Sequence, residues 1–325
     1  MQEKTQAMID RLLHHTEPAI RLKTMVDVLG KPLDDPEVKH VQQELMESVL
    51  VKTLIAQTRD ENGELRSSYS KWRGGHWCLA TLADFHYPKG DERLLPMRDA
   101  HIEWFFSERW QTMIRKLIKN GLQRRCASQE GNAIFSHLRL GIANDRIHDL
   151  AAELVAWQWP DGGWNCDKDP AAHTSSFHET LIPLRALVEY NRHFDNPDTK
   201  TAAERAKEVF LTREMMYGLR SGEIIHPNFA KLYYPYYWHY GYLIGLKVIA
   251  EGGWIDDPRC QKALEYLQTK QLPDGGFPAE KRYYQHSKPT TSGYTLVDWG
   301  GVSKKNSNLW VTVEVLGVLS AACCL

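Results

Sequence analysis

The sequence predicts an all-α protein, an (α/α)6 barrel in which six outer and six inner helices alternate. Helical periodicity runs through nearly the whole chain, and no convincing strand hairpin interrupts it. Amphipathic, charged segments such as residues 199–214 alternate with segments that are apolar on all sides, such as residues 308–322. The first kind keeps a solvated face and the second kind is buried, so the two form an outer and an inner ring. We therefore expect residues 1–325 to form a single domain.

Recognisable signals mark the helix boundaries. Pro18 can begin a helix and Gly30 can end one, whereas Pro96 is expected to interrupt the segment that contains it. Similar capping sequences, Asp34-Asp35-Pro36, Asn196-Pro197 and Asp256-Asp257-Pro258, introduce three outer helices. The twelve expected segments are residues 2–14, 17–29, 35–57, 72–85, 91–119, 128–140, 144–158, 175–190, 198–216, 234–251, 258–270 and 306–324.

A proline–glycine turn occurs twice at the end of an outer helix. It reads QWPDGGW from Gln158 to Trp164 and QLPDGGF from Gln271 to Phe277. Proline fixes φ and the glycines accept positive φ, so both copies are chain reversals whose final aromatic residue is a structural anchor. Weaker copies at residues 57–65, 119–124 and 217–224 indicate one helix-pair unit used several times.

These two turns resemble the QW-type motif of the terpenoid cyclase and protein prenyltransferase toroid superfamily, which includes the squalene-hopene cyclases. The resemblance implies an α/α toroid with a central cavity, whose pocket opens where the inner helices begin. In the resembling prenyltransferases a cysteine near the start of an inner helix holds zinc, and Asn165-Cys166-Asp167 echoes that arrangement. The second turn is followed by no cysteine or histidine through Glu280, so the turn itself does not require one.

Composition and charge exclude several kinds of partner. The chain has 40 basic and 41 acidic residues and a formal net charge of -1, so nothing indicates nucleic acid or an anionic membrane surface. The polar start lacks a signal-peptide core and no apolar run could span a membrane, so we expect a cytosolic protein with a small-molecule substrate. The six cysteines are too few for a disulfide framework, and we expect reduced thiols. The oligomeric state stays open.

If all inner helices begin at the same end, polar side chains in their first turns should line one pocket. Imidazoles titrate near neutrality and buried carboxyls can be raised toward it, which indicates acid–base catalysis by Glu130, His178, His239 and Asp298. The expected substrate-binding residues are His76, Trp77, Gln129, Asn132, Tyr237, Trp238 and Asn308. We expect His76, Glu130, His178, His239 and Asp298 to meet from five segments of the chain.

Several of these residues also have a structural interpretation. Gln129, Asn132 and Asn308 would serve equally well as helix caps or bridges, and His76 as a satisfied core histidine. For a metal, thiolate and imidazole ligands suit Zn²⁺, and the expected ligands are Cys126, Cys166 and His178. Acid–base use of His178 together with Glu179, or Cys166 as a covalent nucleophile, are the alternatives.

Three functions stay open at this point. The leading hypothesis is a prenyltransferase- or terpene cyclase-like enzyme that acts on an isoprenoid or other hydrophobic substrate by acid–base or metal-assisted chemistry, since aromatic walls stabilise developing carbocations. A pocket lined with aromatic rings and carboxylates also suits sugars, so a carbohydrate-active hydrolase or lyase is the alternative. The third hypothesis is a non-catalytic ligand-binding or scaffold toroid, because a fold does not determine a function. The cofactor stays open, with zinc as one possibility.

Overall fold

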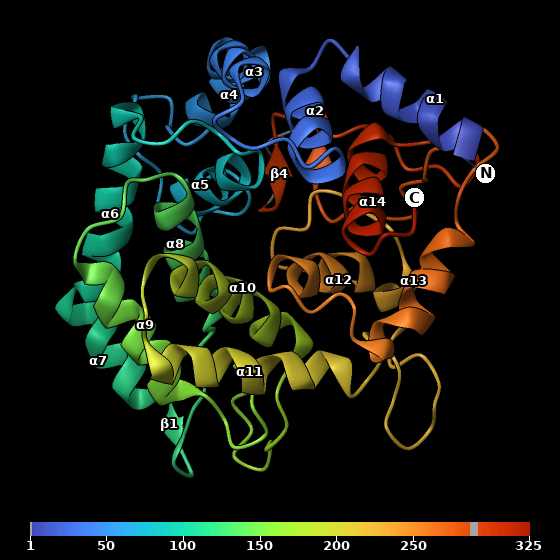
Figure 1. The fold of residues 1–325 in the computed structure, drawn as a ribbon. Helices are drawn as coiled ribbons and strands as arrows, with labels where there is room; N and C mark the ends of the chain where they lie inside the picture. The colour runs from blue at the N-terminus through green and yellow to red at the C-terminus, as the bar shows by residue number, and fades with distance from the viewer. Residues whose placement is uncertain (1, 287–291) are drawn as a thin grey trace. The chain divides into compact units, whose positions relative to one another are not determined.

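Nearly all regular structure is helical in the computed structural model, which describes residues 2–286 and 292–325 (Figure 1). In these two ranges there are four strands of two residues each, and they form two pairs. β1 (Ile118–Lys119) pairs antiparallel with β2 (Leu122–Gln123), and β3 (Gln285–His286) pairs parallel with β4 (Tyr294–Thr295). The backbone therefore agrees with the predicted all-α class.

The chain divides into two compact units. Unit 1 contains Met1–Gln57, Asp84–Pro88 and Arg213–Leu325, and unit 2 contains Thr58–Ala83 and Lys89–Thr212. The expectation of a single domain stays a prediction, because compactness does not decide whether two units unfold cooperatively.

In unit 2, two buried helices pack along each other and amphipathic helices flank them (Figure 1). The buried pair is α8 (Ser128–Arg139) and α10 (Phe177–His193), and the flanking helices include α9 (Arg146–Trp157) and α11 (Pro197–Leu211). The other elements are α5 (Gly75–Asp84), the 3-10 turn η2 (Glu92–Leu94), α6 (Leu95–Phe106) and α7 (Glu108–Lys116).

In unit 1, the buried helices are α12 (Tyr242–Glu251) and α14 (Leu309–Ala321), which pack on each other. α14 also contacts α2 and the π-helical turn η1. The remaining helical elements are α1 (Gln2–Leu13), α2 (Pro18–Lys23), η1 (Thr24–Val28), α3 (Pro36–Glu47), α4 (Val49–Ala56), η3 (Pro227–Ala230), η4 (Pro258–Cys260) and α13 (Gln261–Gln268).

Two long helices that the sequence predicted are each broken by a serine. Ser48 ends α3 and caps α4, with an extended backbone and its Oγ accepting the N–H of Val51 at 3.1 Å. Ser107 separates α6 from α7 in the same way, its Oγ accepting the N–H of Trp110 at 3.3 Å. A serine side chain competes for backbone donors in this way and favours caps over helix interiors. Pro96, expected to interrupt a helix, instead lies in the first turn of α6.

The fifth expected inner helix begins later than predicted. Residues 234–241 are irregular and α12 starts at Tyr242. Pro235 disfavours the helical conformation at the residue before it, and Tyr237 has a positive φ of 48°. The prediction that this aromatic stretch forms the first turns of a helix is therefore wrong.

Both QW-type turns have the same internal hydrogen bonds. The residue before the proline donates its N–H to the second glycine's carbonyl, at 2.8 Å in the first turn and 2.9 Å in the second. The leading glutamine donates its side-chain amide to the first glycine's carbonyl, at 2.8 Å and 3.1 Å respectively. The first glycine has a φ of 98° in one turn and 85° in the other, which only glycine adopts without strain.

Each turn is also tied to the buried helix that follows it. The N–H of Trp164 donates to Thr180 Oγ1 of α10 at 3.1 Å, and that of Phe277 donates to Thr312 Oγ1 of α14 at 2.9 Å. These bonds span 16 and 35 residues of chain. The turn's aspartate binds a serine just before the same helix, Asp161 with Ser175 and Asp274 with Ser307. Both aromatic anchors are buried, as predicted.

Candidate functional site

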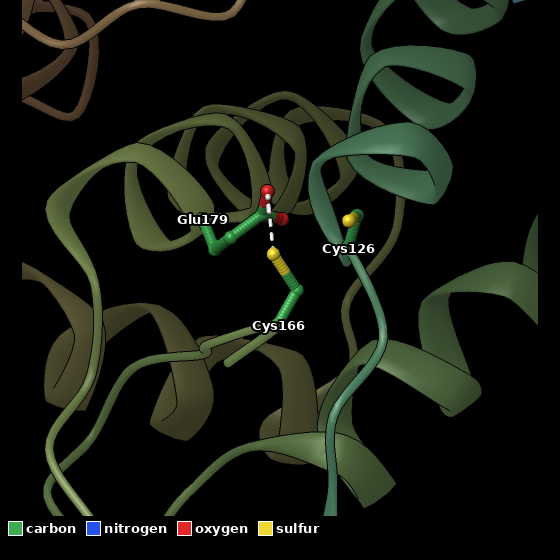
Figure 2. A group of neighbouring side chains, drawn as sticks. All are labelled: Cys126, Cys166 and Glu179. Atoms are coloured by element: carbon green, nitrogen blue, oxygen red, sulfur yellow. Dashed lines mark hydrogen bonds between the residues drawn. The ribbon is translucent and has the colours of Figure 1, made fainter. Parts of the chain in front are cut away.

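Three donor side chains meet beside the start of α10 in unit 2 (Figure 2). Cys126 precedes α8, Cys166 follows the first QW-type turn, and Glu179 lies in the first turn of α10. One donor atom from each lies within 4.8 Å of the others. Cys166 Sγ is 3.6 Å from Glu179 Oε1, and Glu179 Oε2 accepts the N–H of Ser128 at 3.1 Å. The carboxylate thus joins the starts of α8 and α10.

A buried arginine holds the loop that carries Cys166. Arg124, 1% exposed, donates to the carbonyls of Asp167, Pro170 and Ala172 at 2.8, 3.1 and 2.9 Å. Its guanidinium also lies 5.1 Å from the centroid of the Trp159 ring, within the first QW-type turn. Because Arg124 is two residues from Cys126, the same short segment positions both thiols.

The Cys126 thiol stays protonated in the absence of a cation. The hydrogen bond to Cys166, burial and the Glu179 carboxylate together raise the pKa of Cys126 above its usual range. A thiol whose pKa is raised in this way is a poor nucleophile. A bound metal ion would reverse the effect, because coordination deprotonates a thiol outright.

A second polar group surrounds Glu130 in the first turn of α8. Glu130 is 0% exposed, and Arg125 donates through Nε to its Oε1 at 2.7 Å and through Nη2 to Gln129 Oε1 at 2.9 Å. The guanidinium of Arg125 lies 4.0 Å from the centroid of the Trp110 ring. Glu130 Oε2 is buried without a hydrogen-bond partner among the described residues. Burial raises the pKa of Glu130 to about 7, although Arg125 opposes this shift.

The predicted binding residues His76, Asn132 and Trp77 belong to the interior of unit 2. Asn132 Nδ2 lies 3.0 Å from His76 Nε2, and His76 Nδ1 lies 3.1 Å from Nε2 of the buried His101. His76 and Trp77 are 1% and 2% exposed. Burial, with His101 and His137 nearby, lowers the pKa of His76 well below its usual range. These contacts agree with the core-histidine interpretation.

Apart from His178 on α10, the other predicted site residues lie in unit 1. His239 stacks on Tyr283 at a centroid distance of 3.6 Å, and its neighbours Tyr237 and Trp238 are half-buried before α12. Asp298 is exposed and accepts the N–H of Gly300 at 2.9 Å. Asn308 caps α14, because its side-chain oxygen accepts the N–H of Val311 at 3.1 Å, as in its structural interpretation.

The metal-ligand set differs from the prediction in one member. Cys126 and Cys166 are close together as expected, but the third donor is Glu179, and the half-buried His178 does not belong to the group. Consecutive residues of a helix point roughly 100° apart, so only one of the two can face the thiols. The meeting of His76, Glu130, His178, His239 and Asp298 in one pocket stays a prediction.

Sequence reasoning missed a buried ionic cluster in unit 1. Lys23 Nζ, 0% exposed, lies 3.1 Å from Asp84 Oδ2 and 2.7 Å from Glu314 Oε1. Lys247 Nζ lies 2.7 Å from the other oxygen of each carboxylate. The signal was present, since Glu314 is the single charged residue of α14, and Lys247 lies inside α12, whose other charged residue, Glu251, is its last. A cavity of about 180 Å³ borders Asp27, Lys247 and Glu314. Because the charges balance one another, we interpret the cluster as structural.

A bilayer could not be crossed by any helix in the part of the chain that the structure describes. The alternation of buried and amphipathic helices, joined by paired QW-type turns, is that of an α/α toroid protein.

In fold, the chain is similar to a solved structure named "Glycosyl hydrolase family 88 from Bacteroides vulgatus". The similarity covers 100% of this chain and 98% of that chain, with a TM-score of 0.55 and 12% sequence identity. It confirms the predicted fold class, an all-α protein of the α/α toroid type. No protein-family model and no curated protein sequence matches the chain.

Proposed function

We propose that the chain is a carbohydrate-active hydrolase whose general acid is Glu130, in the polar group at the start of α8. The observation that carries the proposal is a fully buried carboxyl group with one oxygen, Oε2, that no described residue binds. Leaving a buried polar atom without a partner costs about 1 to 3 kcal/mol, and in this proposal a bound ligand supplies the partner.

The surroundings of Glu130 suit a general acid that acts on a sugar. Its Oε1 is held by Arg125, so a proton on Oε2 is free to be donated to a ligand oxygen. A pKa of about 7 keeps a large fraction of the carboxyl protonated at neutral pH. The half-buried rings of Tyr69 and Trp110 provide aromatic faces beside the polar groups. In this proposal Glu130 protonates the glycosidic oxygen as its bond to the anomeric carbon breaks. Water then adds to that carbon and loses a proton, and Glu130 regains one.

The fold comparison supports this class of reaction over the leading hypothesis from the sequence. The similar solved structure is named a glycosyl hydrolase, which agrees with the carbohydrate-active alternative. Two QW-type turns still favour the isoprenoid hypothesis, but the sequence contains no Asp-x-Asp-Asp motif of the kind that protonates substrates in class II cyclases. We therefore keep the prenyltransferase- or cyclase-like function as the second candidate.

A ligand panel separates the two candidates. Purified protein is incubated with neutral and uronic-acid oligosaccharides and, separately, with isoprenyl diphosphates, and thermal shifts and reducing ends are measured. A ligand at about 100 times its Kd adds about 2.7 kcal/mol, which is easily detected as a higher Tm. New reducing ends from an oligosaccharide support the proposal, whereas a shift with isoprenyl diphosphates alone supports the second candidate.

A conservative substitution then tests the role of Glu130. Glu130→Gln preserves shape and should lower kcat by roughly 100- to 10,000-fold, the usual contribution of general acid catalysis. Glu189→Gln is the matched control, because Glu189 is a buried glutamate on α10 that forms ion pairs with Arg139 and Arg192. It should lower stability but leave kcat of the folded enzyme nearly unchanged. Equal kcat in Glu130→Gln and the natural protein would refute the assignment.

A further inference from the structure

The structure assigns Cys126, Cys166 and Glu179 as protein ligands of one Zn²⁺ ion in unit 2 (Figure 2). This inference does not rest on the hydrolase proposal. If an experiment refutes one of the two, the other still stands. The zinc inference concerns only these three side chains and the three segments of chain that bring them together.

The donor geometry is close to that of a metal site. Ligands of a tetrahedral zinc ion lie roughly 2.0 to 2.3 Å from the metal, and hence about 3.3 to 3.8 Å from one another. The three donor atoms already lie within 4.8 Å of each other, and Cys166 Sγ is 3.6 Å from Glu179 Oε1. Small rotations of the side chains would therefore complete the coordination. Because the ligands come from three separate segments, the ion would join the starts of α8 and α10 to the loop after the turn.

The chemistry of the donors selects the metal. Two sulfur ligands disfavour Mg²⁺ and Ca²⁺, which take oxygen donors, whereas zinc accepts sulfur and carboxylate together. Two thiolates, one carboxylate and Zn²⁺ sum to a single negative charge. With three protein ligands, the fourth position of the tetrahedron stays available for water or a ligand.

The second QW-type turn provides an internal reference for what the scaffold requires. Counted from the aromatic anchor of each turn, Cys166 corresponds to Ala279. Counted from the threonine that binds the anchor, Glu179 corresponds to Val311. The second copy makes the same turn-to-helix bond without a thiol or a carboxylate at these positions. Turn and helix packing therefore do not explain why both occur in the first copy.

The test begins with the natural full-length chain and needs no variant. The chain is loaded with Zn²⁺, freed of excess metal, and its metal content is measured; we expect about one zinc per chain. Alkylation followed by peptide mass spectrometry should find Cys166 protected with zinc and more reactive after a chelator removes it. Substitution by Co²⁺ should produce the absorption band of thiolate-to-metal charge transfer, and added azide should change the spectrum at the open position.

Variants then locate the ligands. Cys166→Ala and Glu179→Val, which introduce the residues of the second copy, should each weaken zinc binding by about 100-fold or more, since even loss of an outer partner costs 10- to 100-fold. Cys78→Ala, which removes a buried cysteine outside the group, should bind zinc as the natural chain does. The inference is overturned if the natural chain holds no stoichiometric zinc and alkylates equally with and without chelator. It is also overturned if all three variants bind zinc alike.

Discussion

The two QW-type turns are built alike but continue differently. Both turns have the same backbone reversal, the same glutamine bond and the same threonine bond to the following helix. After the first turn come Cys166 and, on α10, Glu179; after the second come Ala279 and, on α14, Val311. The comparison separates the residues that make the turn from those available for chemistry.

The helices that follow the two turns, α10 and α14, each carry a glutamate that is almost fully buried, but the partners of the two glutamates differ. Glu179 is bonded to a thiol and a backbone N–H, whereas Glu314 lies between the ammonium groups of Lys23 and Lys247. Glu314 is therefore compensated by the fixed positive charges of two buried lysines. A compensated carboxylate stabilises a specific structure, while one that faces thiols is suited to bind a cation.

The largest expected effect concerns the compensated glutamate. Lys23→Met should lower the free energy of unfolding by about 3 to 5 kcal/mol, because it leaves Asp84 and Glu314 buried with one cation, Lys247, between them. Chemical denaturation measures the change. Lys262→Met is the control, since Lys262 forms an exposed pair with Glu214 and should cost less than about 1 kcal/mol. Equal effects of the two would show that the cluster does not depend on its buried lysine.

The glycine at the turn should matter equally in both copies. A Cβ at Gly162 would lie 2.6 Å from the carbonyl oxygen of Arg205, and one at Gly275 would clash with the carbonyl of Lys4. We expect Gly162→Ala and Gly275→Ala each to destabilise the protein by about 2 to 3 kcal/mol in urea denaturation. At Gly63, which has a positive φ but open space around it, alanine should cost only about 1 kcal/mol. If the two substitutions lowered the free energy of unfolding by clearly different amounts, the two turns would not contribute equally to stability.

Acid should weaken unit 2 before unit 1. Burial lowers the pKa of His101 to about 3, so between its ordinary value of 6.5 and about 3 the unfolded chain binds a proton that the folded chain does not. Stability is therefore present above pH 6.5 and falls below it by about 1.4 kcal/mol per pH unit for this histidine. In unit 1, burial would raise the pKa of Asp27, but His86 and Lys23 outweigh burial and hold this pKa below its ordinary value of 3.8. The stability that Asp27 contributes is therefore lost only at lower pH.

Hydrogen exchange at pH 7 and pH 5 checks this difference between the units. Amides of α8 and α10 should lose protection at the lower pH while those of α12 and α14 keep theirs. In His101→Phe the slope of stability against pH should decrease by about 1.4 kcal/mol per unit. If that variant keeps the natural slope, other groups of the chain cause the acid sensitivity.

The smallest expected effect concerns the thiol itself. In the presence of a chelator, Cys166→Ala should change the unfolding free energy by less than about 1 kcal/mol, because the second turn forms with Ala279 at that position. With zinc present, the natural chain should become more stable and the variant should not, as thermal melting would show. In the reverse exchange, Ala279→Cys should gain no zinc affinity. A large loss of stability in Cys166→Ala under chelator would instead make this thiol part of the scaffold.

Much of the fold follows from local patterns in the sequence. The alternation of helix types, the capping aspartates at Asp35 and Asp257, and both turns depend on residues close in the chain, and the structure contains them. The breaks at Ser48 and Ser107 were missed because a serine is tolerated inside a helix as well as at its start. Nothing local distinguishes the two cases.

The candidate site was harder to predict because it depends on helix rotation. We expected the helix to start at Ser175, whereas α10 starts at Phe177. Helix boundaries inferred from sequence vary by two residues or more, and each residue turns a side chain by roughly 100°. The sequence pattern therefore could not decide whether His178 or Glu179 is the third donor. Arg124 lies two residues before Cys126, but its role depends on a loop distant in the sequence, to which it donates at the carbonyl of Asp167.

The threonine bond behind each turn has a consequence for how such a chain can evolve. The bond closes 16 residues of chain in the first copy and 35 in the second, with similar lengths of 3.1 and 2.9 Å. Because the entropy of loop closure grows only with the logarithm of length, this difference costs about 0.7 kcal/mol. Insertions between anchor and threonine should thus accumulate at little cost. New recognition surfaces could arise there, one loop at a time, while the framework around them stays unchanged.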